Sequence, residues 1–412
     1  MLRRRASTAL ATMLSGVLAV GHYQPVAAGP VESSGYKVLK PIESGDLTLF
    51  PMVRTNGKTL PADQFLTLDE GLKNGEVEVT EAGKVRGLMR SRSGATPAYR
   101  GDQVNTLVLV NNSKRPLLLL AGEIVTGGKQ DRVIAKDRIV PAGGDPIDLS
   151  VFCIEHGRWT ESSEKFGATA KTPTGSFMVQ PAVRQEAMVA KDQQQVWNSV
   201  NGAITTMASA AAAPMATAGS HGTVTSTVDV QTESVVVNRA TGGPIYRSAP
   251  LATTSYAKAM QTQAVSAKVD EAAAGLMQSR EQALAALRQE HAVGVVVALR
   301  GEVIWADIFS DTELLARYWT KLVRSYAAEG LSAGRGSKSA TIADAQKFLD
   351  AAAHGRETSE GEVGVYRYRE VKADGTDSFA LESLLPGTSY DVHVSKLKIK
   401  DRGLIRTGVI ER

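Results

Sequence analysis

The stretch that decides the fold is VGVVVALRGEVIWADIF at residues 293–309, followed directly by SDTELLARYWTKLVRSYAAEG at residues 310–330. In the first segment two apolar runs flank Arg300-Gly301, which is the pattern of a tight β-hairpin. In the second segment large apolar side chains recur every three or four residues, which is the pattern of an amphipathic helix. The sequence therefore predicts a hairpin that leads directly into a long helix.

The start and end of this helix also carry recognisable signals. Ser310 and Glu313 have the spacing of a capping box, in which Ser310 would accept from the third helical amide and Glu313 would reach back. Gly330 is expected to end the helix. Trp319 lies on the apolar face, so we expect it to be a core residue rather than part of a binding site.

The N-terminal half is expected to be rich in strands. Apolar runs at 104–110 and 117–120 flank a polar loop and predict a hairpin, and the runs at 134–140 and 147–154 predict further strands. The only cysteine, Cys153, lies in the last of these runs, so we expect a buried structural thiol rather than a nucleophile.

The middle and the C-terminal part of the chain combine helices with more strands. Helical patterns occupy 185–200, 266–291 and 341–353. A second hairpin is predicted at 364–384, and a final strand at 390–399. Because strands and helices are not in regular alternation, the sequence predicts an α+β fold of mostly antiparallel strands with packed helices.

One segment differs in composition from the rest. Residues 201–265 are rich in Ala, Thr, Ser and Gly and contain few large apolar side chains that could offset the entropy of ordering. We predict a mobile low-complexity insertion there, with one strand at 234–238, inside a single domain that spans residues 29–412.

The N-terminus has the composition of a cleavable export signal. Three arginines at positions 3–5 precede an uncharged, apolar stretch at 9–20, and Ala27-Ala28-Gly29 offers small residues for cleavage. A membrane-spanning helix needs about 20 apolar residues, so we expect no membrane anchor. Residues 1–28 are therefore predicted to be removed, and the protein is expected to be exported, either periplasmic or secreted.

Composition and missing motifs exclude several classes of function. The formal charge is +4, but the first 28 residues contribute three arginines and no acid, so no basic stripe for nucleic acid remains. The chain lacks Gly-x-Ser-x-Gly, Cys-x-x-Cys and His-Glu-x-x-His, and no two histidines lie four residues apart. We therefore expect no nucleic-acid partner, no metal and no cofactor.

Two polar clusters nevertheless follow apolar runs directly. One is GEIVTGGKQDR at 122–132 and the other is EHGRW at 155–159. Each places a carboxylate and an arginine at the exit of a predicted buried strand, where binding sites are often built. The candidate binding residues are Glu123, Lys129, Gln130, Arg132, Glu155, Arg158 and Trp159.

The same residues allow a functional and a structural interpretation. In the functional one, Arg132 and Arg158 hold a planar anion, Gln130 orients it and Trp159 forms an apolar wall. In the structural one, Glu123 with Arg158, or Glu155 with Arg132, form partly buried ion pairs that fix two turns. Under either interpretation we expect both clusters to come together in the fold.

At these clusters the chain resembles the ARPP-1 family, the "ARG and rhodanese-phosphatase-superfamily-associated protein" domain. The matching segments are 121–123, 127–132, 153–159, 195–197, 293–309 and 313–331, together with His393. The resemblance covers nearly all of residues 29–412, except for about 201–265. The family name implies association with ADP-ribosylglycohydrolase and phosphatase-like proteins, and it implies no particular reaction.

Three functions remain open on the sequence. The first is an exported domain that binds a small anionic or polar ligand, and the second is an envelope protein–protein interaction module. The third is a hydrolase that uses Glu123 and Glu155 as acid and base. We rank the hydrolase last because the sequence offers no complete nucleophile or metal motif.

Overall fold

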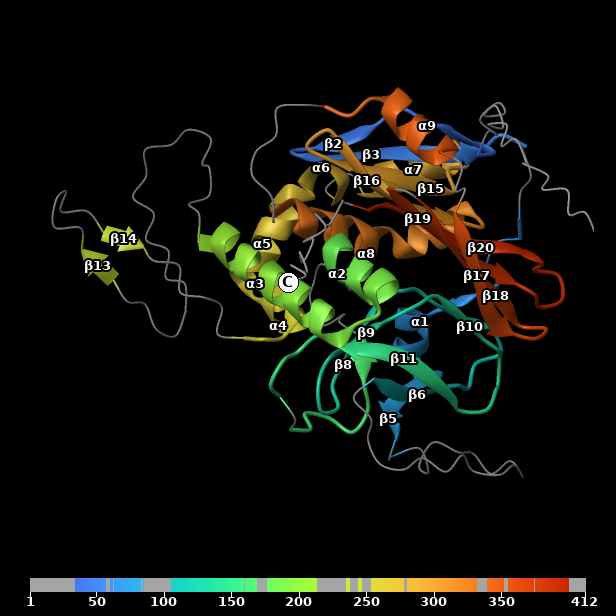
Figure 1. The fold of residues 1–412 in the computed structure, drawn as a ribbon, viewed down its shortest axis with the longest axis horizontal. Coiled ribbons are helices and arrows are strands. Elements are labelled where there is room, and N and C mark those ends of the chain that lie inside the picture. Colours follow the sequence, from blue (N-terminus) through green and yellow to red (C-terminus); the bar gives the residue numbers. More distant parts are fainter. Residues whose placement is uncertain are drawn as a thin grey trace, which may run out of the picture.

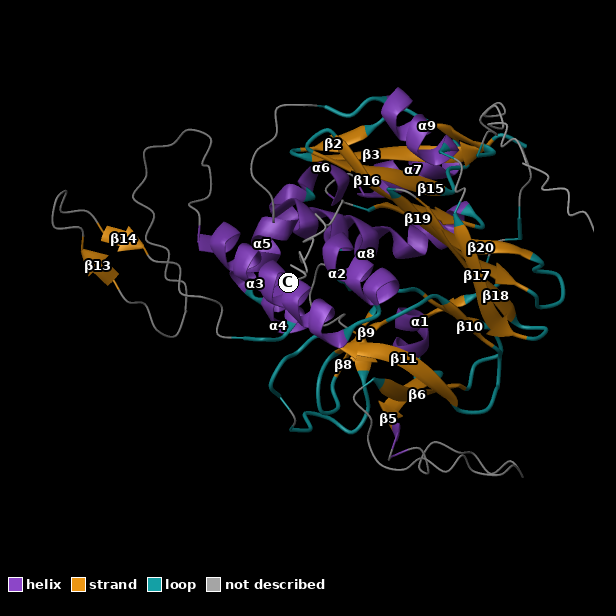
Figure 2. Cartoon of the chain, in the orientation of Figure 1, coloured by secondary structure: helices purple, strands orange, loops and turns teal. Residues whose placement is uncertain are grey.

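The computed structural model describes residues 34–56, 60–61, 63–82, 84, 105–158, 160–168, 176–212, 235–237, 244–246, 253–277, 280–331, 339–351, 355–373 and 375–399. The predicted export signal at 1–28 lies outside these residues, as does Trp159. Helices lie between a large antiparallel sheet and a second group of strands (Figure 1). Figure 2 shows the same division by element type, and the predicted α+β class is confirmed.

The large sheet has nine strands in the order β1-β3-β15-β16-β20-β19-β18-β17, with β2 paired to β3 beside this path. Every neighbouring pair in it is antiparallel. Its strands are β1 (Tyr36–Val38), β2 (Ile42–Ser44), β3 (Leu47–Arg54), β15 (Gly294–Leu299), β16 (Glu302–Phe309), β17 (Arg356–Glu362), β18 (Tyr366–Ala373), β19 (Thr376–Ser383) and β20 (Tyr390–Lys398).

The second group comprises a six-stranded sheet, β12-β8-β9-β11-β6-β5, and a three-stranded sheet, β10-β7-β4. These strands are β4 (Leu66–Thr67), β5 (Val77–Glu81), β6 (Thr106–Asn111), β7 (Leu117–Leu119), β8 (Ile124–Thr126), β9 (Arg132–Ile134), β10 (Arg138–Val140), β11 (Ile147–Cys153) and β12 (Gly167–Ala168). A separate pair, β13 (Val235–Val237) and β14 (Pro244–Tyr246), includes the strand expected at 234–238.

Helices occupy all of the predicted regions, and two further helices, at 68–73 and 256–261, were not predicted. The helices are α1 (Leu68–Lys73), α2 (Pro181–Gln185), a π-helical segment (Glu186–Ala190), α3 (Gln193–Ala212), α4 (Tyr256–Gln261), α5 (Gln263–Ala272), α6 (Ala274–Met277), α7 (Arg280–Gln289), α8 (Thr312–Leu331) and α9 (Ile342–Asp350). Within the described part of the chain, no helix combines the length and the apolar character that a membrane crossing requires.

The hairpin and helix that opened the sequence argument form as predicted. Arg300 and Gly301 have φ of 51° and 77° and join β15 to β16 through a two-residue turn, which requires positive φ at both positions. Consecutive residues of β15 are buried because helix α8 packs on one face of the sheet and α9 on the other. Trp319 on α8 is fully buried, so its assignment to the core is confirmed.

Three local predictions are wrong. Asp311, not Ser310, caps α8, because its Oδ1 accepts from the Leu314 amide at 2.9 Å, while Glu313 pairs with Arg288. Strands β6 and β7 do not form a hairpin, since β6 pairs with β5 and β11 whereas β7 pairs with β4 and β10. The strand expected at 134–140 is two strands, β9 and β10, which belong to different sheets.

The boundaries of the predicted insertion are also wrong. Helix α3 continues to Ala212 and buries Ile204 and Met207, while α4, from Tyr256, buries Met260 and α5, from Gln263, buries Val265. Alanine is the best helix former, so an alanine-rich segment next to an apolar stripe extends the helix instead of interrupting it. Apart from β13 and β14, residues 213–252 lie outside the described part.

Candidate functional site

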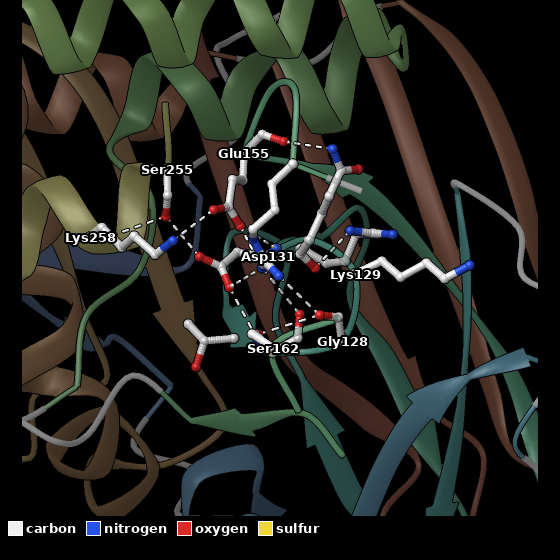
Figure 3. A network of polar contacts seen from close by, with 12 residues as sticks. Gly128, Lys129, Asp131, Glu155, Ser162, Ser255 and Lys258 are labelled. Atoms are coloured by element: carbon white, nitrogen blue, oxygen red, sulfur yellow. Dashed lines mark hydrogen bonds and ion pairs between the residues drawn. The ribbon is translucent and has the colours of Figure 1, made fainter. Parts of the chain in front are cut away.

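Most of the predicted site residues come together where the β8–β9 turn meets the end of β11 and the start of α4 (Figure 3). We call the set Asp131, Glu155, Arg158, Ser255 and Lys258 the 131/155 cluster. Three separate segments of the chain meet here: Glu155 follows β11, Asp131 precedes β9, and Ser255 is the N-cap of α4. The sequence argument missed Ser255 and Lys258, because they lie about 100 residues further along the chain.

Glu155 is the centre of the cluster. Its carboxylate is almost fully buried, and it accepts from Arg158 Nη2 at 2.6 Å and from Lys258 Nζ at 2.9 Å. The Asp131 amide donates to the same carboxylate at 3.2 Å. Burial alone would raise the pKa of Glu155, but the hydrogen bonds from Arg158 and Lys258 outweigh it, and the pKa lies below its ordinary value.

Asp131 is held differently. Ser255 Oγ donates to its Oδ2 at 2.7 Å and the Gly127 amide donates to its Oδ1 at 3.1 Å, while Arg158 Nη2 is 3.7 Å from Oδ1. Burial is the largest influence here and raises the pKa of Asp131 above its ordinary value. The two carboxyls of the cluster therefore have pKa values shifted in opposite directions.

Arg158 contacts both the turn before Gln130 and the carboxylates of Asp131 and Glu155. Its Nη1 donates to the carbonyls of Gly128 at 3.0 Å and Thr160 at 2.7 Å. Gly128 has a φ of 50°, and a Cβ there would stand 2.2 Å from the Phe166 ring, so only glycine fits this turn. The arginine is thus both an ion-pair partner and a backbone clamp.

Arg132 and Gln130 fix the backbone next to the cluster through hydrogen bonds to carbonyl groups. Arg132 is wholly buried, with Nη1 donating to the Gln130 carbonyl at 2.7 Å and Nη2 lying 3.8 Å from Glu81 Oε1. Gln130 Nε2 donates to the Glu155 carbonyl at 2.8 Å. The Lys129 amide donates to Glu81 at 3.0 Å, while its side chain points away from the cluster (Figure 3).

Glu123 does not join the cluster, so the prediction that the polar segments 122–132 and 155–159 come together is wrong for this residue. Glu123 is fully buried against α8, where it pairs with Lys321 and accepts from the Leu120 amide at 2.8 Å. Lys321 Nζ also lies 2.9 Å from Asp69. Burial raises the pKa of Glu123, although Lys321 opposes this effect.

The ion pairs predicted from the sequence therefore do not form, and each glutamate has a different partner. The sequence argument paired Glu123 with Arg158 and Glu155 with Arg132, whereas the structure joins Glu123 to Lys321 and Glu155 to Arg158 and Lys258. The reason is topological: Glu123 lies at the open end of the β8–β9 hairpin, where the Ile134 amide donates to its carbonyl, whereas Glu155 lies next to Asp131 at the turn end. Glu123 and Glu155 thus serve separate ion pairs, which removes the basis for their use as an acid–base pair.

A second polar network lies deep in the core, and the sequence argument had noted only its histidine. We call it the His393 network, and its members are Asp137, Arg184, Asp307, Tyr326, His393 and Ser395. His393 Nδ1 is 2.6 Å from Asp137 and its Nε2 is 3.2 Å from Asp307. Burial would lower the pKa of His393, but the two aspartates raise it to about 9.

The described residues contain neither a group of metal ligands nor a reactive cysteine. Among them, no group of three or more His, Cys, Asp or Glu side chains is placed to hold a metal ion. Cys153 is buried as expected, and burial raises the pKa of its thiol to about 11, which disfavours the reactive thiolate. The 131/155 cluster remains the candidate site, because two of its cations are partly exposed.

All residues of both polar networks lie in a segment of the chain that matches one protein family. The model of the ARG and Rhodanese-Phosphatase-superfamily-associated Protein domain, ARPP-1, matches residues 35–397. The chain belongs to the ARPP-1 family. No curated protein and no solved structure matches it. In this ARPP-1 domain the segments around Glu155 and His393, which carried the resemblance in the sequence, occupy the centres of two distinct polar networks.

Proposed function

We propose that this ARPP-1 protein is an exported binding domain whose ligand is a small anion, held at the exposed side of the 131/155 cluster. One observation carries the proposal: Arg158 and Lys258, which lie 100 residues apart in the chain, converge on the same buried carboxylate and still reach the surface. The Arg158 side chain is 18% exposed and that of Lys258 is 56% exposed. Basic groups fixed in this way suit a phosphate, sulfate or carboxylate.

Unused hydrogen-bond donors support the proposal. Arg158 Nε is buried and has no hydrogen-bond partner among the described residues. A lysine ammonium has three donors, and one of those on Lys258 is directed at Glu155. The Nε of seven other arginines in the described residues also lacks a hydrogen-bond partner, so the support comes from Lys258, whose remaining donors are on a side chain that is 56% exposed.

The charges of the cluster act in the same direction. Two cations face two carboxyls, and the raised pKa of Asp131 makes one of these carboxyls closer to neutral than an exposed aspartate would be. Protonation of Asp131 would leave the cluster with a net positive charge. Anion binding should therefore strengthen as the pH falls toward the raised pKa of Asp131.

Arg132 is not part of this proposed site. Its guanidinium is fully buried against Glu81, so its role is to hold the Gln130 turn in place. The anion-binding role that the sequence suggested for Arg132 passes to Lys258 in the proposal.

The proposal is tested with sulfate, which keeps its charge over the working pH range. Addition of sulfate at constant ionic strength should raise the melting temperature of residues 29–412 by mass action. The Lys258→Gln variant should weaken sulfate binding roughly tenfold, the effect of losing one charge-assisted hydrogen bond. Isothermal titration calorimetry at two pH values should show tighter binding at the lower one.

Lys398→Gln is the matched control, because Lys398 is 47% exposed and its Nζ also lies 2.9 Å from a glutamate, the exposed Glu302. This variant should bind sulfate as the unmodified chain does. Equal sulfate affinity in both variants, or no binding of sulfate, phosphate or acetate at all, would remove the proposed site.

Export is the second part of the proposal, and it is supported by the sequence of residues 1–28. We expect the mature chain to begin at or near Gly29. N-terminal sequencing of protein recovered from the envelope or the medium tests this, and an intact start with the three arginines would contradict it.

A further inference from the structure

Strand β17 forms a long edge of the nine-stranded sheet. Its seven residues pair with β18, from Arg356 opposite Lys372 to Glu362 opposite Tyr366, and all seven are exposed. In the described ranges of the chain, no strand pairs with its other side. In Figure 1 β17 lies beside β18, at the end of the large sheet that is near β10.

Such an edge is unusual because it leaves a row of backbone donors and acceptors free to pair. Natural sheets shorten, cover, bend or charge their edges to prevent association. The opposite edge of this sheet follows that rule, since β1 has three residues. Strand β17 is longer and carries charge instead, since four of its seven residues are charged, and Val363, which directly follows it, is 100% exposed.

One register of self-pairing uses all seven residues of β17 without opposing like charges. If two copies of β17 run antiparallel and are centred on Ser359, Arg356 of each copy faces Glu362 of the other. Thr358 then faces Glu360, and Glu357 faces Gly361, so no like charges are opposed. Centring one residue later would place Glu360 opposite its own copy.

The negative charge of the edge is also reduced by neighbouring cations. Lys136 Nζ lies 2.9 Å from Glu360, and Arg138 Nη2 lies 3.6 Å from Glu362. Two of the three glutamates of β17 are thus paired before a second copy approaches. Repulsion between the two acidic strands is correspondingly weak.

We propose that β17 is a dimer interface, at which two copies of this chain pair antiparallel and continue the large sheet from one copy into the other. The proposal is independent of anion binding, because β17 and the 131/155 cluster share no residue. It rests on the length of the free edge and on the complementary positions of Arg356 and Glu362.

The test exchanges these two charges. Sedimentation velocity of residues 29–412 over a range of concentrations should show a monomer–dimer equilibrium. Arg356→Glu and Glu362→Arg should each weaken dimerisation roughly tenfold or more, because either change opposes like charges at two symmetry-related positions. An equimolar mixture of the two variants should recover the dimer, since every cross-strand pair in the mixed dimer again joins opposite charges.

Lys37→Glu on β1 is the matched control, because it reverses one exposed charge on the opposite edge of the same sheet. It should leave the dimer unchanged, and circular dichroism should show that all variants are folded. A monomeric chain at every concentration, a dimer that is insensitive to the β17 variants, or a mixture that stays monomeric would overturn the proposal.

Discussion

Asp307 is the most heavily bonded carboxylate described in the core. It accepts from Arg184 at 2.9 Å, from Ser395 at 2.8 Å, from Tyr326 and from His393 at 3.2 Å. Burial would raise its pKa, but Arg184 and His393 bring it well below the ordinary value. With Asp137 as the second anion, the network is neutral when His393 is protonated, so its stability depends on the charge of one imidazole.

We therefore expect a fall in stability at alkaline pH. The pKa of His393 is about 9 in the folded protein, above its ordinary value of 6.5. Its contribution should be fully present below about pH 6.5 and should be lost as the pH rises through about 9, for a total of roughly 3 kcal/mol. Denaturant unfolding at a series of pH values measures this change.

The His393→Gln variant separates this effect from other titrations. It should be less stable near neutral pH, and it should lack the part of the alkaline fall that belongs to the imidazole. An identical pH profile in both proteins would show that His393 does not carry a proton in the folded state.

At the start of helix α8, two neighbouring residues, Ser310 and Asp311, could each serve as the N-cap. The sequence predicts Ser310 as the cap, but Ser310 Oγ donates to Asp311 at 3.0 Å, and Asp311 in turn accepts from the Leu314 amide. The serine hydroxyl thus supports the capping carboxylate instead of capping the helix itself. Both residues satisfy the rules for a cap, and their surroundings decide between them.

Substitution of each residue distinguishes the two roles. Asp311→Ala should destabilise the protein by about 1 kcal/mol, the usual effect of losing an N-cap. Ser310→Ala should cost less, because the Leu314 amide keeps its partner. Urea unfolding of the two variants tests this order, and a larger loss for Ser310→Ala would favour the capping box.

At the scale of the whole molecule, the helical layer connects the large sheet to the second group of strands. Trp319 on α8 lies in the main core cluster, which includes residues of β3, β15 and β16 as well as of β8 and β9. At the start of α4, Ser255 binds the helical layer to Asp131 in the β8–β9 turn, and Lys258 binds it to Glu155 after β11. Binding at the 131/155 cluster would thus occur at a junction between two parts of the fold.

Trp319→Ala should destabilise the whole domain by roughly 3–5 kcal/mol, because it leaves a large cavity at this junction. Thermal and denaturant unfolding should still show one transition if the layers fold together. A variant with unchanged stability but altered sulfate affinity would place Trp319 in a binding site and contradict its role in the core.

The sequence by itself determined the α+β class, the hairpin at 293–309 and the long helix that follows it. These features depend on neighbours within a few residues, so periodicity, turn residues and i,i+3 spacing reveal them. Only the tertiary structure decided that β6 and β7 enter different sheets, that Glu123 pairs with Lys321, and that His393 meets Asp137. The contact of His393 with Asp137 spans 256 positions. A buried charge requires a partner of opposite sign, but nothing in its local sequence specifies where along the chain that partner lies.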